Sequence, residues 1–223
     1  MVFDFFRSTG STAVEAVEAK LAGMLRDGRD VYDAATDALF GGGKSKATKR
    51  EVRSTDWEIN VAQQEVRREL MVHASTHGSV DLPHVLAYMS IVKDAERIGD
   101  YAKNLYDLVR YGADFSAVSD RVELEKYRHA VGTLIDEAAE VFEARDTDRA
   151  QHLIEKADDF LDEHDAGVRA AFRSEGTPAD AAARALYYRF LKRITAHIMN
   201  LLTSLVMPID RLDYYDEVKE DRV

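Results

Sequence analysis

Cysteine is absent from the 223-residue sequence. Disulfides and thiolate metal sites are therefore excluded, and any metal ion would need oxygen or imidazole ligands. Proline occurs only at positions 83, 178 and 208, so long stretches of the chain contain no helix breaker. No apolar run approaches the roughly 18 residues that a membrane span requires. The chain begins with a segment too short and too acidic for a signal peptide, so we expect a cytoplasmic protein.

Positive charge is also scarce. The chain carries 30 lysines and arginines against 41 aspartates and glutamates, which gives a formal net charge of −11. Because proteins bind nucleic acids mainly through cations on phosphates, a nucleic acid partner is not expected. A protein partner with a basic surface fits this charge better.

Helix signals occupy most of the chain, and no alternating strand pattern is found. Capping boxes at Thr12–Glu15 and Thr48–Glu51 mark two helix starts. Asp81 is placed to cap another helix, and Thr177 followed by Pro178 marks the start of the last one. The expected helices span about residues 12–40, 48–78, 81–112, 119–145, 147–176 and 177–208.

The two halves of the sequence resemble each other. Asp56–Asn60 aligns with residues 158–162, and Arg97–Ile98 aligns with Arg193–Ile194. In both halves the matched segments fall on the second and third expected helices. We therefore predict an all-α fold of two tandem three-helix bundles related by a pseudo-twofold axis. The two repeats are assigned to residues 1–115 and 116–223.

The third expected helix carries a polar row. Glu96, Asp100 and Asn104 follow one another at four-residue intervals and so lie on one helix face. Two like charges one turn apart destabilise an isolated helix, so a compensating cation, basic partner or metal is expected. Gly99 lies within the row and lowers helix stability unless a neighbouring element approaches closely.

The second expected helix carries Asp56 and Asn60 one turn apart. If the two helices are antiparallel neighbours, several oxygen ligands converge, a set that suits Mg²⁺, Ca²⁺, Mn²⁺ or iron. The alternative is a solvated face in which Arg97 or Lys103 neutralises the acids. The predicted metal ligands are Asp56, Asn60, Glu96, Asp100 and Asn104.

The second repeat departs from this pattern. Lys192 stands where the first repeat has Glu96, and Ala196 replaces the second carboxylate. A lysine beside Asp158 or Asp162 would neutralise the second repeat without a metal ion. The alternative is that the lysine points into water.

Three classes of function remain open. The sequence contains no His-Glu-x-x-His, P-loop or Gly-x-Ser-x-Gly motif, and its histidines are scattered. An enzyme would need an activated nucleophile or water with a base beside it, so we predict no catalytic residues. A regulatory protein that docks on a transporter or kinase is favoured over a metal-dependent enzyme and over a metal-storage or structural protein.

The run Glu96-Arg97-Ile98-Gly99-Asp100, followed by Asn104, resembles the hallmark of the PhoU family of phosphate-signalling regulators. Asp56, Ile59 and Asn60 are similar to the companion signature on the second helix. The resemblance covers both repeats. It implies carboxylate metal sites that hold iron or zinc, with manganese or magnesium also open, and the substitutions in repeat two argue against a second site.

The resemblance also implies a function. A protein of this family would be a homodimeric cytoplasmic regulator of phosphate transport and phosphate-starvation signalling. Its partners would be the ATPase or permease of a Pst-type transporter and a sensor histidine kinase, through which alone it would associate with the membrane. The aromatic segment Phe3–Arg7 resembles accessory proteins of Pit-type phosphate transporters, which keeps that role open. A metal-dependent enzyme that uses the repeat-one carboxylates is the other alternative.

Overall fold

The computed structural model describes residues 12–77 and 81–212, and all of the regular structure in these ranges is helical. The elements are α2 (Thr12–Asp37), the π-helical turn η1 (Ala38–Gly42), α3 (Lys46–His77), α4 (Leu82–Tyr111), α5 (Arg121–Ala144), α6 (Thr147–Phe172), α7 (Pro178–Val206) and the 3₁₀ turn η2 (Ile209–Arg211). The predicted all-α class is confirmed. The segment Phe3–Arg7 lies outside the described residues.

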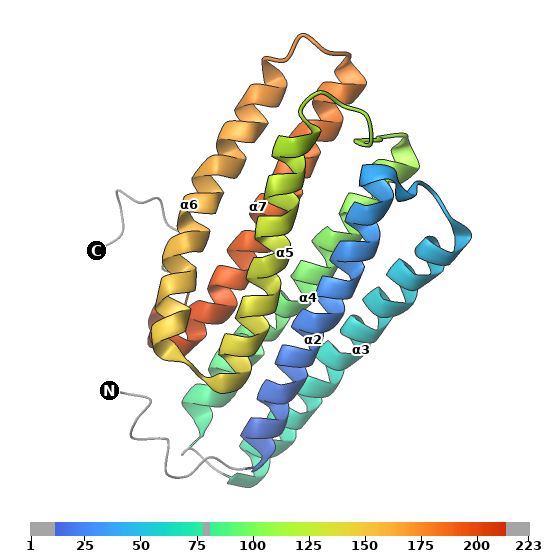
Figure 1. The fold of residues 1–223 in the computed structure, drawn as a ribbon. Coiled ribbons are helices and arrows are strands. Elements are labelled where there is room, and N and C mark those ends of the chain that lie inside the picture. Colours follow the sequence, from blue (N-terminus) through green and yellow to red (C-terminus); the bar gives the residue numbers. More distant parts are fainter. Residues whose placement is uncertain (1–11, 78–80, 213–223) are drawn as a thin grey trace.

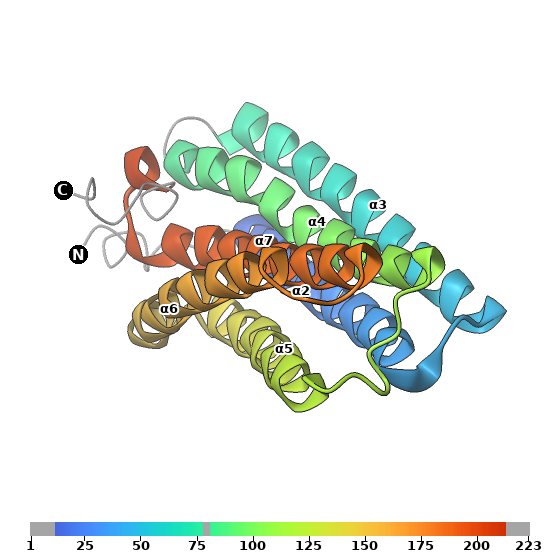
Figure 2. The ribbon, with the colours of Figure 1, turned by 90° about the horizontal axis from the view of Figure 1, so that it is seen from above.

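The helices form two three-helix bundles, α2–α4 and α5–α7, as predicted (Figure 1). α4 packs beside α7 and α2 beside α5, so α3 and α6 lie on opposite flanks (Figures 1 and 2). Buried apolar side chains from all of these helices form one continuous core. None of the helices in the described ranges is long and apolar enough to cross a bilayer. The division near residue 115 falls in the α4–α5 loop and stays a prediction.

A ring stack lies where the two repeats meet. Tyr101 on α4 and His197 on α7 occupy equivalent positions of the two repeats, and their rings stack with centroids 5.6 Å apart and planes 20° apart. Residues related by a twofold axis contact each other only close to that axis. The stack therefore places the pseudo-twofold axis between α4 and α7.

Asp81 stands at the N-cap position of α4 as predicted, but two of the predicted capping hydrogen bonds, those of Thr48 and Asp81, are not formed. The hydroxyl of Ser45 accepts a hydrogen bond from the backbone N–H of Thr48 at 2.9 Å, so Ser45 caps α3 and Thr48 lies inside its first turn. The carboxylate of Asp81 makes no cap hydrogen bond; it lies 2.9 Å from Nε2 of His73. Thr177 caps α7 as predicted, because its hydroxyl accepts a backbone N–H in the first turn.

Candidate functional site

The α3–α4 seam depends on the missing side chain of Gly99. A Cβ at this position would lie 2.7 Å from Cδ1 of Ile59, well inside the optimal separation of two carbon atoms. On α2, a Cβ at Gly28 would lie 3.3 Å from Cγ2 of Ile98. The two glycines let α4 pack closely against both α3 and α2. The predicted close approach at Gly99 is confirmed, and it brings the predicted ligands of α3 and α4 to one seam.

Asp56 and Asp100 converge across this seam on one ammonium group. Nζ of Lys103 donates to Oδ1 of Asp56 and to Oδ1 of Asp100, at 2.8 Å in each case. The two carboxylate oxygens are therefore no farther apart than twice that distance. Arg97 donates to the other oxygen of Asp100 at 3.3 Å. Burial lowers the pKa of Lys103, but its hydrogen bonds to the two aspartates raise it above the usual value, so the ammonium stays charged.

The other three predicted ligands make different contacts. Glu96 is buried and pairs with the ammonium of Lys93. The side-chain amide of Asn60 donates to the backbone carbonyl of Asp56 at 2.8 Å. Asn104 is half-buried, one turn beyond the second seam aspartate. Of the predicted ligands, Asp56 and Asp100 share the ammonium of Lys103, whereas Glu96 pairs with Lys93.

The resemblance to the PhoU family implies a metal ion at this seam. Within residues 12–77 and 81–212, no three histidine, aspartate or glutamate side chains form a group that could hold a metal. The donor set fits a cation in one respect, because two carboxylates from different helices already converge on a positive charge. A divalent ion would have to displace Lys103 and draw Glu96 away from Lys93. The metal site therefore stays a prediction.

A basic groove adjoins the acidic pair and was not predicted from the sequence. Lys103 lines a cavity of about 170 Å³ together with Lys49, Arg53 and Arg110. The sequence feature that could have predicted it is the pair Lys49 and Arg53, which lie one turn apart on α3. Like the acidic row on α4, this pair places two like charges on one helix face. The seam is thus a surface of mixed charge in a strongly acidic protein.

In the second repeat, Lys192 pairs with an aspartate of α6, but not with either of those predicted. Its Nζ lies 2.6 Å from Oδ2 of Asp165, three residues beyond Asp162. The part of α6 that faces Lys192 thus lies about one turn closer to the C-terminus than the alignment with repeat one implied. An ammonium stands in this repeat where the first repeat has a carboxylate, and Lys192 does not simply point into water.

A polar cluster between α4 and α7 was also missed. Oδ1 of Asp94 accepts hydrogen bonds from Nδ1 of His197 at 2.8 Å and from the side-chain amide of Asn200 at 3.1 Å. Arg193 donates to the hydroxyl of Tyr101 at 3.2 Å. These residues join the two repeats. The sequence feature that could have predicted the cluster is the presence of polar residues on the core-facing stripes of both helices.

A second inter-repeat contact surrounds Glu18, which is buried on α2. Its carboxylate accepts from the hydroxyl of Tyr88 on α4 and, at 2.8 Å, from Nε of Arg145. Arg145 ends α5 in the left-handed conformation, with φ of 51°. The carboxylate of Glu18 thus contacts residues of both three-helix bundles.

These features define a class: an all-α protein of two packed three-helix repeats, with a charged seam between the second and third helices of the first. Residues 21–109, which include the seam, match the family model of the PhoU domain. The resemblance to the PhoU family that the sequence motifs indicated is thus confirmed over residues 21–109.

Solved structures have the same fold over both repeats. The phosphate transport system regulatory protein PhoU from Streptococcus pneumoniae has a TM-score of 0.74 and 16% identity, covering 94% of this chain and 97% of that one. PhoU from Pseudomonas aeruginosa has a TM-score of 0.74 and 21% identity, covering 87% of this chain and 95% of that one. At these identities the likeness establishes the fold alone. No curated protein matches the sequence.

Proposed function

We propose that this protein regulates phosphate transport and phosphate-starvation signalling by binding other proteins in the cytoplasm, as a homodimer. The observation that carries the proposal is the PhoU domain over residues 21–109. A solved protein with the same fold is described as a phosphate transport system regulatory protein. The partners we propose are the ATPase or permease of a Pst-type transporter and a sensor histidine kinase.

The charge of one groove supports a basic partner surface. Asp30, Asp33, Asp37 and Glu51 line a cavity of about 470 Å³ between α2 and α3. Burial raises the pKa of Asp33, although nearby arginines oppose the shift. Arg29 pairs with Asp33 and Arg128 with Asp37, so the four acids of the groove exceed the cations beside them by two. An excess of one charge sign attracts an oppositely charged surface and orients it during encounter.

Gene deletion tests the proposal. We expect deletion to change phosphate uptake or a phosphate-starvation reporter, and expression of the intact chain to restore both. Repeating the deletion in strains that lack either the Pst-type or the Pit-type transporter identifies the partner, because the effect disappears only with the correct one. Unchanged uptake and reporter at low and high phosphate would reject the regulatory function.

A separate assay addresses the enzymatic alternative. We expect the purified protein, supplied with Mg²⁺, Mn²⁺, Fe²⁺ or Zn²⁺, to show no turnover of phosphate esters. Turnover that is lost in Asp100→Asn and retained in Asp165→Asn, a matched change in repeat two, would instead favour a metal-dependent enzyme.

A further inference from the structure

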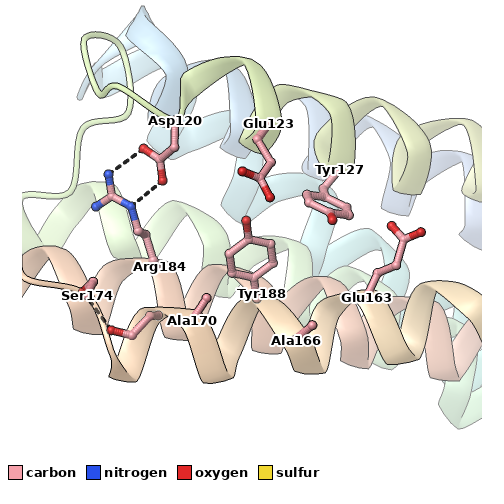
Figure 3. Close-up of a pocket in the computed structure, with 11 residues that line it drawn as sticks. Asp120, Glu123, Tyr127, Glu163, Ala166, Ala170, Ser174, Arg184 and Tyr188 are labelled. Carbon is pink, nitrogen blue, oxygen red and sulfur yellow. Dashed lines mark hydrogen bonds and ion pairs between the residues drawn. The ribbon is translucent and has the colours of Figure 1, made fainter.

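The second repeat contains a cavity of about 420 Å³ between α5, α6 and α7 (Figure 3). Its lining residues come from the first turns of α5 and the last turns of α6. These are the ends away from the turn that joins the two helices, and Figure 2 shows that the helices separate with distance from that turn. Glu123 of α5 and Glu163 of α6 line it together with Tyr127 and Tyr188; the carboxylate of Glu123 lies near Tyr188, and that of Glu163 lies on the far side of Tyr127 (Figure 3). Small residues of α6 complete the wall: Ala166, Gly167, Ala170 and Ala171.

The cavity is negatively charged. Asp120, at one end, is neutralised by Arg184, whose Nε and Nη2 each lie 2.7 Å from a carboxylate oxygen (Figure 3). Neither Glu123 nor Glu163 has an ion-pair partner within the ranges that the structure describes. Burial raises the pKa of the Tyr127 hydroxyl, and the charges of both glutamates raise it further. Glu163 also accepts a hydrogen bond from this hydroxyl. Two carboxylates without a cation beside them thus border the same open cavity.

We propose that this cavity binds an arginine side chain of a partner protein. A guanidinium is planar and weakly hydrated, so it can donate to two carboxylates and lie against an aromatic ring, which a compact ammonium does less well. Arg184, which lines the same cavity, already binds in this way. Its guanidinium donates two hydrogen bonds to Asp120 and lies 5.7 Å from the ring centroid of Phe115. Lys126 also lies over the ring of Tyr127, at 5.3 Å, so one aromatic ring of the cavity already contacts a cation.

The surroundings of the cavity suit an arginine with apolar neighbours. A Cβ at Gly167 would lie 2.5 Å from the ring of Tyr188, so this ring lies directly on the α6 backbone and forms a flat apolar surface. Val122 and Phe172 are each 81% exposed and adjoin cavity residues in sequence. They are the exposed large apolar side chains nearest in sequence to the cavity residues.

Calorimetry on the whole protein tests the site with a blocked Leu-Arg-Leu peptide and its citrulline counterpart, which keeps the shape and lacks the charge. We expect the arginine peptide to bind about ten-fold more tightly than the citrulline peptide. The variant Glu123→Gln/Glu163→Gln should weaken arginine binding about ten-fold. The control Glu140→Gln/Glu155→Gln, which removes the same charges from α5 and α6 outside the cavity, should bind like the wild type.

A second variant tests the cavity without removing charge. Ala170 lines the cavity and is exposed, so Ala170→Phe should fill the space, abolish peptide binding and leave the melting temperature nearly unchanged. Equal binding of the citrulline peptide, full binding by Ala170→Phe, or equal loss in the control would overturn the proposal. Tighter binding of spermidine than of the peptide, lost in the glutamine variant, would assign the cavity to free polyamines. This inference adds a docking site to the proposed function, but binding is measured without the transporter, so either can fail independently.

Discussion

A single methyl group should have opposite effects at two glycines of this protein. At Gly99, an added Cβ would lie 2.7 Å from Cδ1 of Ile59, a side chain that is only 1% exposed and has little room to move. Overpacking of this kind costs about 1–3 kcal/mol, which outweighs the gain in helix propensity of roughly 0.5–1 kcal/mol. We expect Gly99→Ala to lower the free energy of unfolding by about 1 kcal/mol, as measured by urea denaturation.

Two further variants test the cause. Gly23 lies inside α2, and a Cβ there would meet nothing within 4 Å, so Gly23→Ala should stabilise the protein by roughly 0.5–1 kcal/mol. Ile59→Val removes the clashing Cδ1 and should recover most of the loss in a Gly99→Ala background. If Gly99→Ala were as stable as Gly23→Ala, close packing of α3 on α4 at this point would be wrong.

One buried histidine should make stability depend on pH. Burial lowers the pKa of His164 from 6.5 to about 4; its backbone contact with Phe160 and the charge of Asp165 oppose this shift, while Lys192 adds to it. The folded state therefore holds this histidine neutral. Its contribution to stability is complete above the unfolded pKa and is lost as pH falls through the folded pKa, because the unfolded state then binds one more proton. The loss should approach roughly 3 kcal/mol at 1.36 kcal/mol per pKa unit.

His164→Leu should therefore flatten the dependence of unfolding free energy on pH between about pH 6.5 and pH 4.5. His129→Leu is the matched control, because both imidazoles contact the carbonyl one turn earlier, but His129 is exposed. An unchanged slope in His164→Leu would show that this histidine does not contribute.

At the scale of helix pairs, the seam between α3 and α4 depends on Lys103. The change Lys103→Met removes the ammonium shared by Asp56 and Asp100. Without metal, the two aspartates would face each other uncompensated, and we expect a loss of about 1–2 kcal/mol for this half-buried pair. With Fe²⁺, Zn²⁺, Mn²⁺ or Mg²⁺, the variant should bind metal more tightly than the wild type and recover stability, because no ammonium has to leave.

Calorimetric titration with each metal, followed by thermal denaturation, measures both effects. Asp100→Asn should weaken metal binding in either background. Lys156→Met removes an ammonium from an exposed pair with Glu137 in repeat two and should leave metal affinity unchanged. Failure of Lys103→Met to bind any of the four metals would exclude a metal site at this seam.

The sequence predicts the helices better than their ends and their side-chain partners. Periodicity and the Thr177–Pro178 start locate α7 correctly, but Ser45 rather than Thr48 caps α3. Two residues of similar capping strength stand close together, and tertiary packing decides between them. The prediction of the wrong partner for Lys192 has a similar cause. About one turn of α6 separates Asp165, the observed partner, from Asp162, and an alignment of the two repeats does not resolve a shift of that size.

At the scale of the whole molecule, the internal repeat predicts two three-helix units but not how they pack together. Inter-repeat contacts join residues more than one hundred positions apart, such as Asp94 with His197 and Glu18 with Arg145. No local pattern marks such pairs, because each depends on the rotation of one bundle against the other. The cavity in repeat two escaped prediction for the same reason, since it requires α5 and α6 to diverge.

The overall charge should govern how the protein meets its partner. We expect binding to the transporter or kinase to slow several-fold as salt rises from about 50 to 300 mM, because exposed charges are screened beyond about 10 Å at 0.1 M salt. Asp30→Lys/Glu51→Lys reverses two exposed acids of the α2–α3 groove and should slow association more than it speeds dissociation. Glu140→Lys/Glu155→Lys makes the same change of charge on repeat two and should have a smaller effect. Surface plasmon resonance with the purified partner measures both rates. Equal slowing by the two variants would indicate that net charge alone, rather than the groove, directs the encounter.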